Sequence, residues 1–594
     1  MRKLVSITFV LLMCTLQLFA QEKTVTGKVT DEKDGTPLSG VSITVKGSTI
    51  GTTTGADGSF SLNVPSSARA LVFTYVNFLS QEVTIGSRSV FNVLLATEET
   101  TLSEVVVVGY GTQQKKAFTG SASKIDAKEF SQLATPSIDR QLGGRAAGVQ
   151  VSTPGGLVNT PARIRIRGVN SLTQGRDPLI VVDGVPFVSG NLALGTNSNA
   201  LGDINPNDIE NIEVLKDGSA TAIFGSRAAN GVIMITTKKG DKSGRLKVNY
   251  DMNYGFANVM NKWDLLNANE FITIANEKLA NGGNLPRAFP NADGAEYDWQ
   301  NEVLIRNAPT VTQNLSFSGG GNKSSYFFSL GYTDQKGVIF TNTNKTYRLR
   351  FNYDTEINKF LRFGSNTTLS KQINTDQNTG ANSLGGAIAA SLRLPPNVNP
   401  RNANHPSGFN IQFPAGNSIG AGPNAQIVDD NFNNVAFTLR ANFQQSDLLR
   451  LVSNSFLELS PVKGFKIRTG LTYDLTTDYS FTRLDNRHGD GAGINGFVSN
   501  LGQNVSRITW QNFANYNFSI AQHNFFLTAG HEIQRDQTKQ MSSSFQNVSD
   551  IFFIRENLIS GSGVTANVAG FIGRFALQSF FGRFNYDFNN KYFL

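Results

Sequence analysis

Few residue patterns in this chain could carry covalent chemistry. Residues 416–420 read GNSIG and match the G-x-S-x-G motif, in which a serine nucleophile stands on a sharp turn between a strand and a helix. Here the motif lies among prolines, glycines and asparagines, so we interpret the match as chance. The four histidines share no metal-site spacing, and HEIQR at 531–535 is not the HExxH motif of zinc enzymes. The sequence therefore predicts no enzyme and no metal or organic cofactor.

Single residues and the net charge argue against three further kinds of site: cysteine-based sites, calcium loops and nucleic-acid-binding surfaces. Cys14 is the only cysteine and lies in the first 20 residues, which leaves no disulfide framework or thiolate metal site in the mature chain. Asp31, Asp34 and Asp57 do not have the spacing of a calcium loop and are predicted to form turns. The net charge of +8 comes from scattered Lys and Arg residues, whereas a nucleic-acid-binding surface gathers them on one face. We expect no nucleic-acid partner.

The remaining chemistry is non-covalent, and its strongest candidate is a run of four valines. Residues 102–113 read LSEVVVVGYGTQ, and β-branched residues favour a strand. The flanking sequence is polar and linker-like, and no neighbouring segment is an obvious pairing partner. Either the segment is an internal strand of an adjoining domain, or its partner lies in another protein.

The elements around this segment begin with a predicted secretory signal peptide at 1–20. Arg2 and Lys3 precede an apolar run that ends at Phe19, and this run is too short to span a membrane and stay there. After residue 21 there is no stretch of 18 apolar residues, so any membrane crossing must use strands.

Residues 22–97 are predicted to fold as a small β-sandwich. Short alternating segments such as TVTGKVTD and VSITVKGS are separated by turn signals such as Asp57-Gly58. The stretch GKVTDEKDGTPLSGVSITVKGSTIGTTTGADGSF at 27–60 resembles the carboxypeptidase-regulatory-like, transthyretin-type module. A linker at 98–116 follows and contains the valine run.

Residues 117–240 mix short strands and helices, which predicts an α+β domain. The stretch from 208 to 240 contains a strand (IEVLK), a small-residue helix (SATAIFGSRAAN) and a second strand (GVIMITT), in a hairpin-like or βαβ-like arrangement. In ARIRIRG, Arg163, Arg165 and Arg167 occupy alternate strand positions and therefore share one face.

Residues 244–594 are dominated by long segments of alternating character. In KTYRLRFNYDTEI at 345–357, Tyr, Leu and Phe alternate with Arg, Asn and Asp, and the stretches 245–257 and 465–475 repeat the pattern. These strands run about 10–13 residues against about 5–6 in soluble proteins. Such strands are typical of a transmembrane β-barrel with an apolar lipid face and a polar lumen. VAFTLRANF at 435–443 also scans as a strand, although the alternation of short turns and long loops requires a loop there.

Taken in order, the chain resembles the SusC/RagA-type TonB-dependent outer-membrane transporters. The resemblance is carried by LSEVVVVGYGTQQKKAFTGSAS, RIRGVNSL, PLIVVDGVPF, IEVLKDGSATAIFGSRAANGVI and NYDFNNKYFL. It implies that residues 117–240 are a plug inside the barrel and that the valine run is the TonB box. The box residues would add as a strand to the edge of a sheet in TonB, which the ExbB/ExbD motor drives. These residues are Glu104, Val105, Val106, Val107 and Val108.

The resemblance carries further expectations. The three arginines would form ion pairs with carboxylates of the barrel wall or, alternatively, a solvated strand face. The barrel would lie in outer-membrane lipid with the box and sandwich in the periplasm, and a SusD-like surface lipoprotein would cover it. The cargo would be an oligosaccharide or a peptide. A surface binding or adhesion protein without energy-coupled transport is the alternative function.

The barrel is expected to be incomplete. Family members close a barrel of about 22 strands, whereas the sequence after residue 244 offers about 10 to 12. The predicted fold is thus mainly β, with a sandwich, an α+β plug and part of an antiparallel barrel. Because an open sheet edge is not tolerated in hydrocarbon, we expect this chain to be the N-terminal portion of a longer protein.

Overall fold

The computed structural model of the chain divides into two compact units, Met1–Val105 and Val106–Leu594. The predicted signal peptide and Glu104 lie outside the residues that the structure describes. The described residues are 22–76, 78–96, 105–108, 111–114, 121–126, 137–153, 155–169, 175–291, 294–377, 386–417, 419, 433–548, 566–589 and 591–593.

The first unit is a β-sandwich. One sheet has the order β4 (Ser59–Pro65), β1 (Glu22–Asp31), β7 (Val90–Leu95), and the other has the order β3 (Gly51–Thr53), β2 (Ser42–Val45), β5 (Ala70–Thr74), β6 (Gln81–Thr84). Inward-facing residues such as Val25, Ile43 and Phe73 are fully buried between the sheets. The turn prediction is confirmed for the aspartates, because each accepts a hydrogen bond from a backbone N–H two residues later. The backbone bond from Thr36 lowers the pKa of Asp34, and the pKa of Asp57 is lowered first by a hydrogen bond from the Ser59 hydroxyl and then by the backbone bond.

The plug is built on a five-stranded mixed sheet. Its order is β10 (Ala122–Asp126), β15 (Ile209–Leu215), β16 (Val232–Thr237), β13 (Leu179–Val182), β14 (Val185–Phe187). β15 and β16 are antiparallel, so the 208–240 stretch is hairpin-like, with α4 (Gly218–Thr221) and η5 (Ala222–Ala228) between its strands. A smaller pair, β11 (Val149–Ser152) and β12 (Arg163–Ile166), packs on the same core. Branched residues such as Ile164, Ile212 and Ile233 fill that core.

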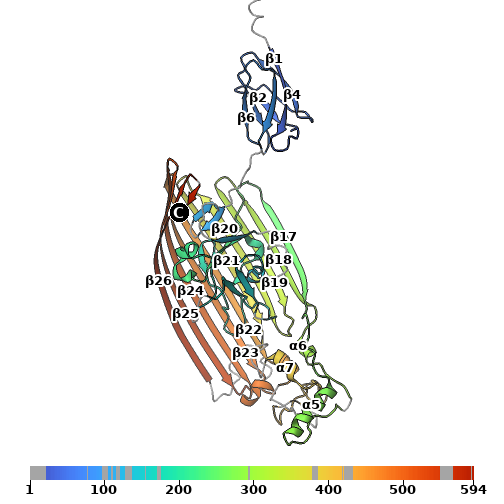
Figure 1. Ribbon diagram of the computed structural model, residues 1–594. Coiled ribbons are helices and arrows are strands. Elements are labelled where there is room, and N and C mark those ends of the chain that lie inside the picture. The colour runs from blue at the N-terminus through green and yellow to red at the C-terminus, as the bar shows by residue number, and fades with distance from the viewer. Residues whose placement is uncertain are drawn as a thin grey trace, which may run out of the picture. The chain divides into compact units, whose positions relative to one another are not determined.

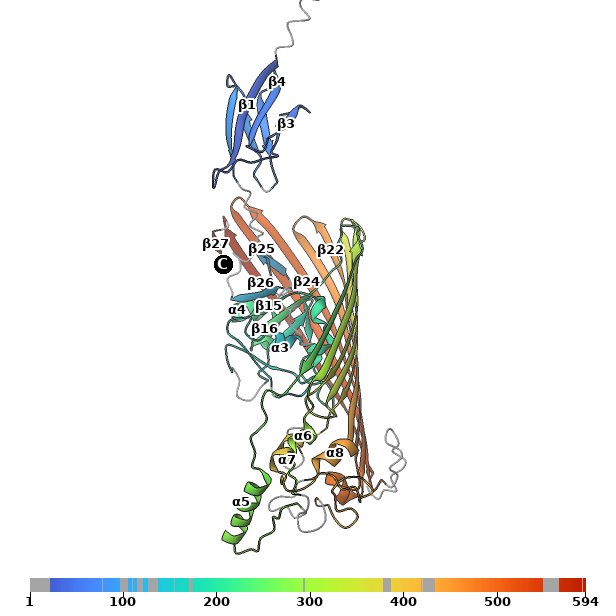
Figure 2. The same cartoon turned by 90° about the vertical axis from the view of Figure 1, so that its right-hand side faces the viewer.

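An eleven-stranded antiparallel sheet, here called the wall, curves around the plug (Figure 1; Figure 2). This number lies within the predicted range, and each strand pairs with its neighbour in the sequence. The strands are β17 (Lys247–Ala257), β18 (Ala308–Gly320), β19 (Ser324–Lys336), β20 (Thr343–Glu356), β21 (Leu361–Thr375), β22 (Phe443–Val462), β23 (Phe465–Leu484), β24 (Phe497–Ile520), β25 (His523–Gln546), β26 (Ala566–Phe588) and β27 (Tyr592–Phe593). Among the described residues, β17 and β27 form its two edges.

The two faces of the wall differ as the alternation predicts. On β20, Arg348, Arg350 and Asn352 are at most 7% exposed because they face the plug, while Tyr347 and Phe351 on the opposite face are at least 40% exposed. Aromatic rings of neighbouring strands contact each other on that outer face, and the centroids of the Tyr332 and Tyr347 rings lie 5.2 Å apart. The wall thus has a polar concave face and an apolar, Tyr- and Phe-rich convex face, as in a barrel that lies in lipid.

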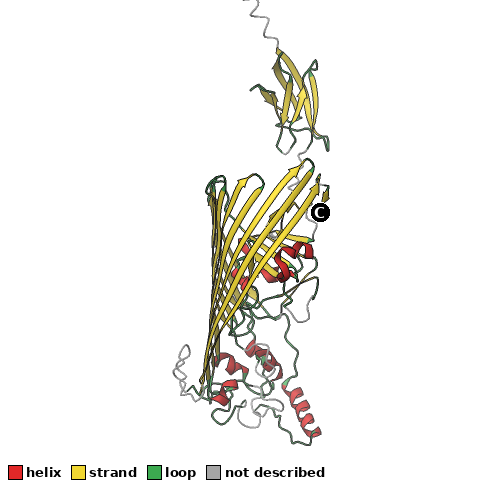
Figure 3. Cartoon of the chain, turned by 90° about the vertical axis from the view of Figure 1, so that its left-hand side faces the viewer, coloured by secondary structure: helices red, strands yellow, loops and turns green. Residues whose placement is uncertain are grey.

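One end of the wall has short turns, and the other carries longer segments with helices (Figure 3). The helices are α5 (Ala268–Asn281), α6 (Gln300–Val303), α7 (Ala387–Arg393), α8 (Val435–Ala441) and the 3₁₀ helix η7 (Gly489–Ile494). The prediction of a strand at 435–443 is therefore wrong. The alternation of short turns and long loops predicted a loop there, and this prediction is confirmed. Asn434 caps α8 by accepting a hydrogen bond from Phe437 N. No described helix is long and apolar enough to cross a membrane.

Candidate functional site

The plug is attached to the wall by a buried cluster around Arg350. Asp183 and Gly184 form the two-residue turn between β13 and β14, and both have positive φ, as a type I′ turn requires. Because side chains alternate along β20, Arg350 faces this turn. The Arg350 guanidinium donates hydrogen bonds to Asp183 Oδ2 at 2.6 Å and to Thr237 Oγ1 at 2.8 Å. Thr237 N donates to Asp183 Oδ1 at 3.0 Å, and Asn352 donates to Thr237 Oγ1 at 3.0 Å. We call these four residues the Arg350 cluster.

A second ion-pair cluster lies around Arg450 on β22, whose side chain is 1% exposed. Its guanidinium contacts Asp474 of β23 at 2.8 Å and Asp203 of the plug at 3.3 Å. It also lies over the ring of Phe187, 3.9 Å from the centroid. Asp203 accepts two more hydrogen bonds from the wall, from Ser370 and Gln372. A plug carboxylate is thus held between one wall cation and two wall dipoles.

The remaining contacts between plug and wall are also mostly polar. Arg227 in η5 contacts Glu532 of β25 at 2.6 Å. Ser329 donates to the buried Asp208 at 2.6 Å, and burial raises the pKa of that carboxyl. Three side-chain amide hydrogen bonds of 2.7 Å join Asn159 to Gln372, Asn159 to Asn374 and Asn205 to Asn314. Polar groups can exchange such bonds for water when the two surfaces separate, so a polar interface costs less to open than an apolar one of the same area.

The structure assigns the plug–wall ion pairs to other residues than Arg163, Arg165 and Arg167. Arg165 contacts Asp177 at 2.5 Å, and Arg167 contacts Asp217, so both pairs lie within the plug. Arg163 is exposed. The reason is that Ile164 and Ile166 are buried in the plug core, which turns the arginine face of β12 toward the plug's own surface.

The valine segment forms β8 (Val105–Val108) and pairs with β9 (Gly111–Gln114) in a separate two-stranded sheet. The expectation that the strand has no partner in this chain is therefore wrong. However, β8 joins neither the sandwich sheets nor the plug sheet, so it is not an internal strand of either described domain. An isolated pair of strands is marginally stable and leaves an edge to which another strand can add.

The described ranges offer little for metal or nucleophilic chemistry. In them, no three His, Cys, Asp or Glu side chains come together in a way that could hold a metal ion. Two residues of the GNSIG motif, Ser418 and Gly420, lie outside these ranges.

Each of the two units contains a segment that matches a known protein family. Residues 25–108 match the CarboxypepD_reg-like domain, and residues 114–232 match the TonB-dependent Receptor Plug Domain. TonB-dependent receptor P3 of Formosa agariphila is 34% identical over 100% of this chain and 56% of its own length. TonB-dependent receptor SusC of Bacteroides thetaiotaomicron is 31% identical over 97% of this chain and 56% of its own length. The chain belongs to the SusC/RagA type of TonB-dependent transporters. It spans about half the length of these curated relatives.

Solved structures show a similar architecture. The RagAB peptide importer in its "open-open" state is 26% identical and superposes with a TM-score of 0.67, over 82% of this chain and 55% of that one. The ferric citrate transporter FecA, at 13% identity and a TM-score of 0.50 over 80% and 54% of the chains, shares the fold alone. Membership in the family makes this an outer-membrane protein.

Proposed function

We propose that this chain takes part in TonB-dependent import of oligosaccharides or peptides across the outer membrane. The observation that carries the proposal is a plug attached to the wall by hydrogen bonds and ion pairs, and preceded by a valine strand outside both neighbouring domains. TonB would pair with residues 104–108 and draw on the plug, because a strand edge can transmit force through main-chain hydrogen bonds.

The proposal includes an orientation and a partner. The short-turn end of the wall faces the periplasm, where the sandwich and the valine segment lie after export by the signal peptide. The longer segments face outward and meet a SusD-like lipoprotein. RagAB is described as a peptide importer, which supports a peptide as one of the two cargo classes. This chain itself holds and gates the cargo and breaks no bond in it.

Deletion of residues 104–108 tests the proposal in the full protein. We expect uptake of labelled peptide or oligosaccharide to stop, while binding at the cell surface continues, because the deletion removes the contact with TonB and no outer segment. The matched control deletes residues 98–102, which shortens the linker equally and keeps the valines. Uptake that continues without residues 104–108 would contradict the proposal and favour the surface-binding alternative.

A further inference from the structure

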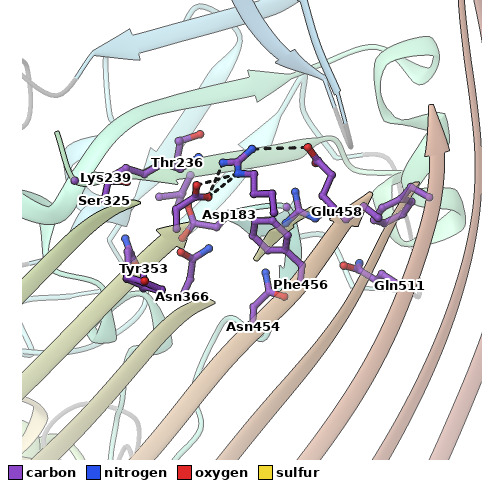
Figure 4. A pocket seen from close by; sticks show the side chains of 18 of the residues that line it. Asp183, Thr236, Lys239, Ser325, Tyr353, Asn366, Asn454, Phe456, Glu458 and Gln511 are labelled. Atoms are coloured by element: carbon purple, nitrogen blue, oxygen red, sulfur yellow. Dashed lines mark hydrogen bonds and ion pairs between the residues drawn. The ribbon is translucent and has the colours of Figure 1, made fainter. Parts of the chain in front are cut away.

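A cavity of about 250 Å³ lies between the plug and the wall, near the short-turn end. The plug contributes Asp183 and the segment after β16, including Lys239. The wall contributes residues from the turn ends of β19 to β24, among them Glu458 and Phe456 (Figure 4). Pockets for drug-sized ligands measure about 300–1,000 Å³, so this one fits a single charged or polar group of a solute rather than a whole oligomer.

The cavity lining carries three cations, Lys239, Arg362 and Arg468, and three carboxylates. Its three carboxylates belong to Asp183, Asp354 and Glu458, and each has a cation within 4 Å. Those cations are Arg350, Arg362 and Lys466, respectively. Arg468 and Lys239 also line the cavity, and within the described part of the chain neither forms an ion pair. Because Arg350 and Lys466 reach these carboxylates from outside the lining, Arg468 and Lys239 remain without an ion pair of their own among the described residues, although Arg468 lies across the sheet from Glu458.

Arg468 is held in place by an aromatic ring. Its guanidinium lies 3.5 Å from the centroid of Phe456, an inward-facing residue of β22 that is 8% exposed. Phe456 fits there because its neighbour on β21 is Gly364, where a Cβ would overlap the ring. A ring stacked on one face of a guanidinium leaves its N–H donors at the edge free, and these donors match a carboxylate in two parallel hydrogen bonds.

The cavity is also linked to the attachment of the plug. Asp183 and Asn352 line it and are members of the Arg350 cluster. Movement of the Asp183 turn away from Arg350 would therefore separate plug and wall at this cavity. A solute that passes between plug and wall would meet Arg468 and Lys239 last, at the periplasmic end.

We propose that this cavity is a transit site for a carboxylate group of the transported solute, with Arg468 and Lys239 as the receiving cations. The inference rests on the proposed function, because it takes the solute to pass along this side of the plug. The carboxylate could come from the C-terminus of a peptide or from an acidic sugar, and the two sources present the same chemistry to the guanidinium.

Binding to the purified protein tests the site without TonB or transport. Asn366→Cys places a thiol in the cavity lining, and the natural Cys14 lies in the predicted signal peptide, so a fluorophore can be attached at one position. The probes are trialanine with a free carboxylate, trialanine amide, trigalacturonate and neutral trigalactose. We expect the fluorophore to respond to the two acids, to distinguish them by affinity, and to respond at least about ten-fold more weakly to the neutral probes.

Two substitutions and a control complete the test. Arg468→Gln should weaken binding of the acids at least about ten-fold and leave the neutral probes unchanged. Lys239→Gln, at an exposed residue, should act in the same direction without endangering the fold. Lys359→Gln removes a positive charge in the turn before β21, outside the cavity lining, and should change nothing. Equal binding of trialanine and its amide to the labelled protein would overturn the proposal even if both variants failed to fold.

The outcome can be separated from that of the proposed function. Suppose that the acids bind and that Arg468→Gln weakens their binding, but uptake continues after deletion of residues 104–108. The transit site is then supported and the proposed transport mechanism is contradicted. If uptake depends on residues 104–108 but acids and neutral probes bind with equal affinity, the transport mechanism is supported and the transit site is contradicted.

Discussion

Replacement of Asp183 by Asn is expected to loosen the plug at the Arg350 cluster. The side chains of Arg350 and Asp183 are 5% and 7% exposed, so the substitution leaves a buried guanidinium without its carboxylate. Loss of one partner of a buried ion pair costs about 3–5 kcal/mol. We expect the lower end, about 3 kcal/mol, because Arg350 keeps its hydrogen bonds to Thr237 and Thr368.

Hydrogen exchange at the Thr237 amide measures this loss directly, since that N–H donates to Asp183 Oδ1. A change of 1.36 kcal/mol corresponds to a factor of ten, so about 3 kcal/mol should accelerate exchange by about a hundred-fold. Asp177→Asn is the matched control, because Asp177 is 67% exposed and pairs with Arg165 within the plug. Acceleration by less than about three-fold in Asp183→Asn would refute the view that this ion pair holds the plug.

Three further predictions concern the wall and the longer segments at its helical end. Arg450→Met should lower the free energy of unfolding by about 3–5 kcal/mol, measured by thermal unfolding, because two buried carboxylates lose their cation. Gly364→Ala should cost about 1–3 kcal/mol in the same assay, because its Cβ overlaps the Phe456 ring, whereas Gly155→Ala, with open space around it, should be nearly neutral. Burial of His488 lowers its pKa from 6.5 to about 4, so acid should weaken the longer segments at the helical end of the wall progressively between these values and lower their free energy of unfolding by about 3 kcal/mol at pH 4. His488→Asn should flatten that pH dependence of unfolding; an unchanged slope would show that another group titrates.

The sign of the pH effect follows from which state binds the proton. His488 Nε2 accepts a hydrogen bond from Asn434 N at 2.7 Å, which only the neutral ring can do. The unfolded segment takes up a proton near pH 6.5 and the folded one only near pH 4. Stability is therefore complete above pH 6.5 and falls as the pH decreases through this window.

The sequence predicted the wall well because strand alternation is local. A period of two in KTYRLRFNYDTEI is enough to put Arg348 and Arg350 on the face opposite Tyr347 and Phe351. The Asp-Gly pair at 183–184 likewise indicates a two-residue hairpin turn from its residue types alone. The contact between Arg350 and Asp183 joins residues 167 positions apart, and it depends on how the plug docks in the wall. No local pattern carries that information.

The sequence-based predictions were wrong where a short segment fits both a strand and a helix pattern, or fits neither. In VAFTLRA at 435–441 the apolar residues fit a strand period and also a buried helix, and the Asn434 cap decided for the helix. GTQQ at 111–114 has no β-branched run, so its pairing with the valines could not be foreseen. For β12, alternation correctly placed the arginines on one face but could not say whether that face meets the wall or the plug's own carboxylates.

The central claim is that the plug must move against the wall for transport. Asn205 of the plug and Asn314 of β18 are joined by a 2.7 Å hydrogen bond, so Asn205→Cys with Asn314→Cys places one thiol on each side of this contact. In the full protein, we predict that uptake stops when a short bis-methanethiosulfonate reagent bridges the two thiols through mixed disulfides, returns when dithiothreitol cleaves the bridge, and persists in both single variants. Undiminished uptake by fully cross-linked protein would contradict the account.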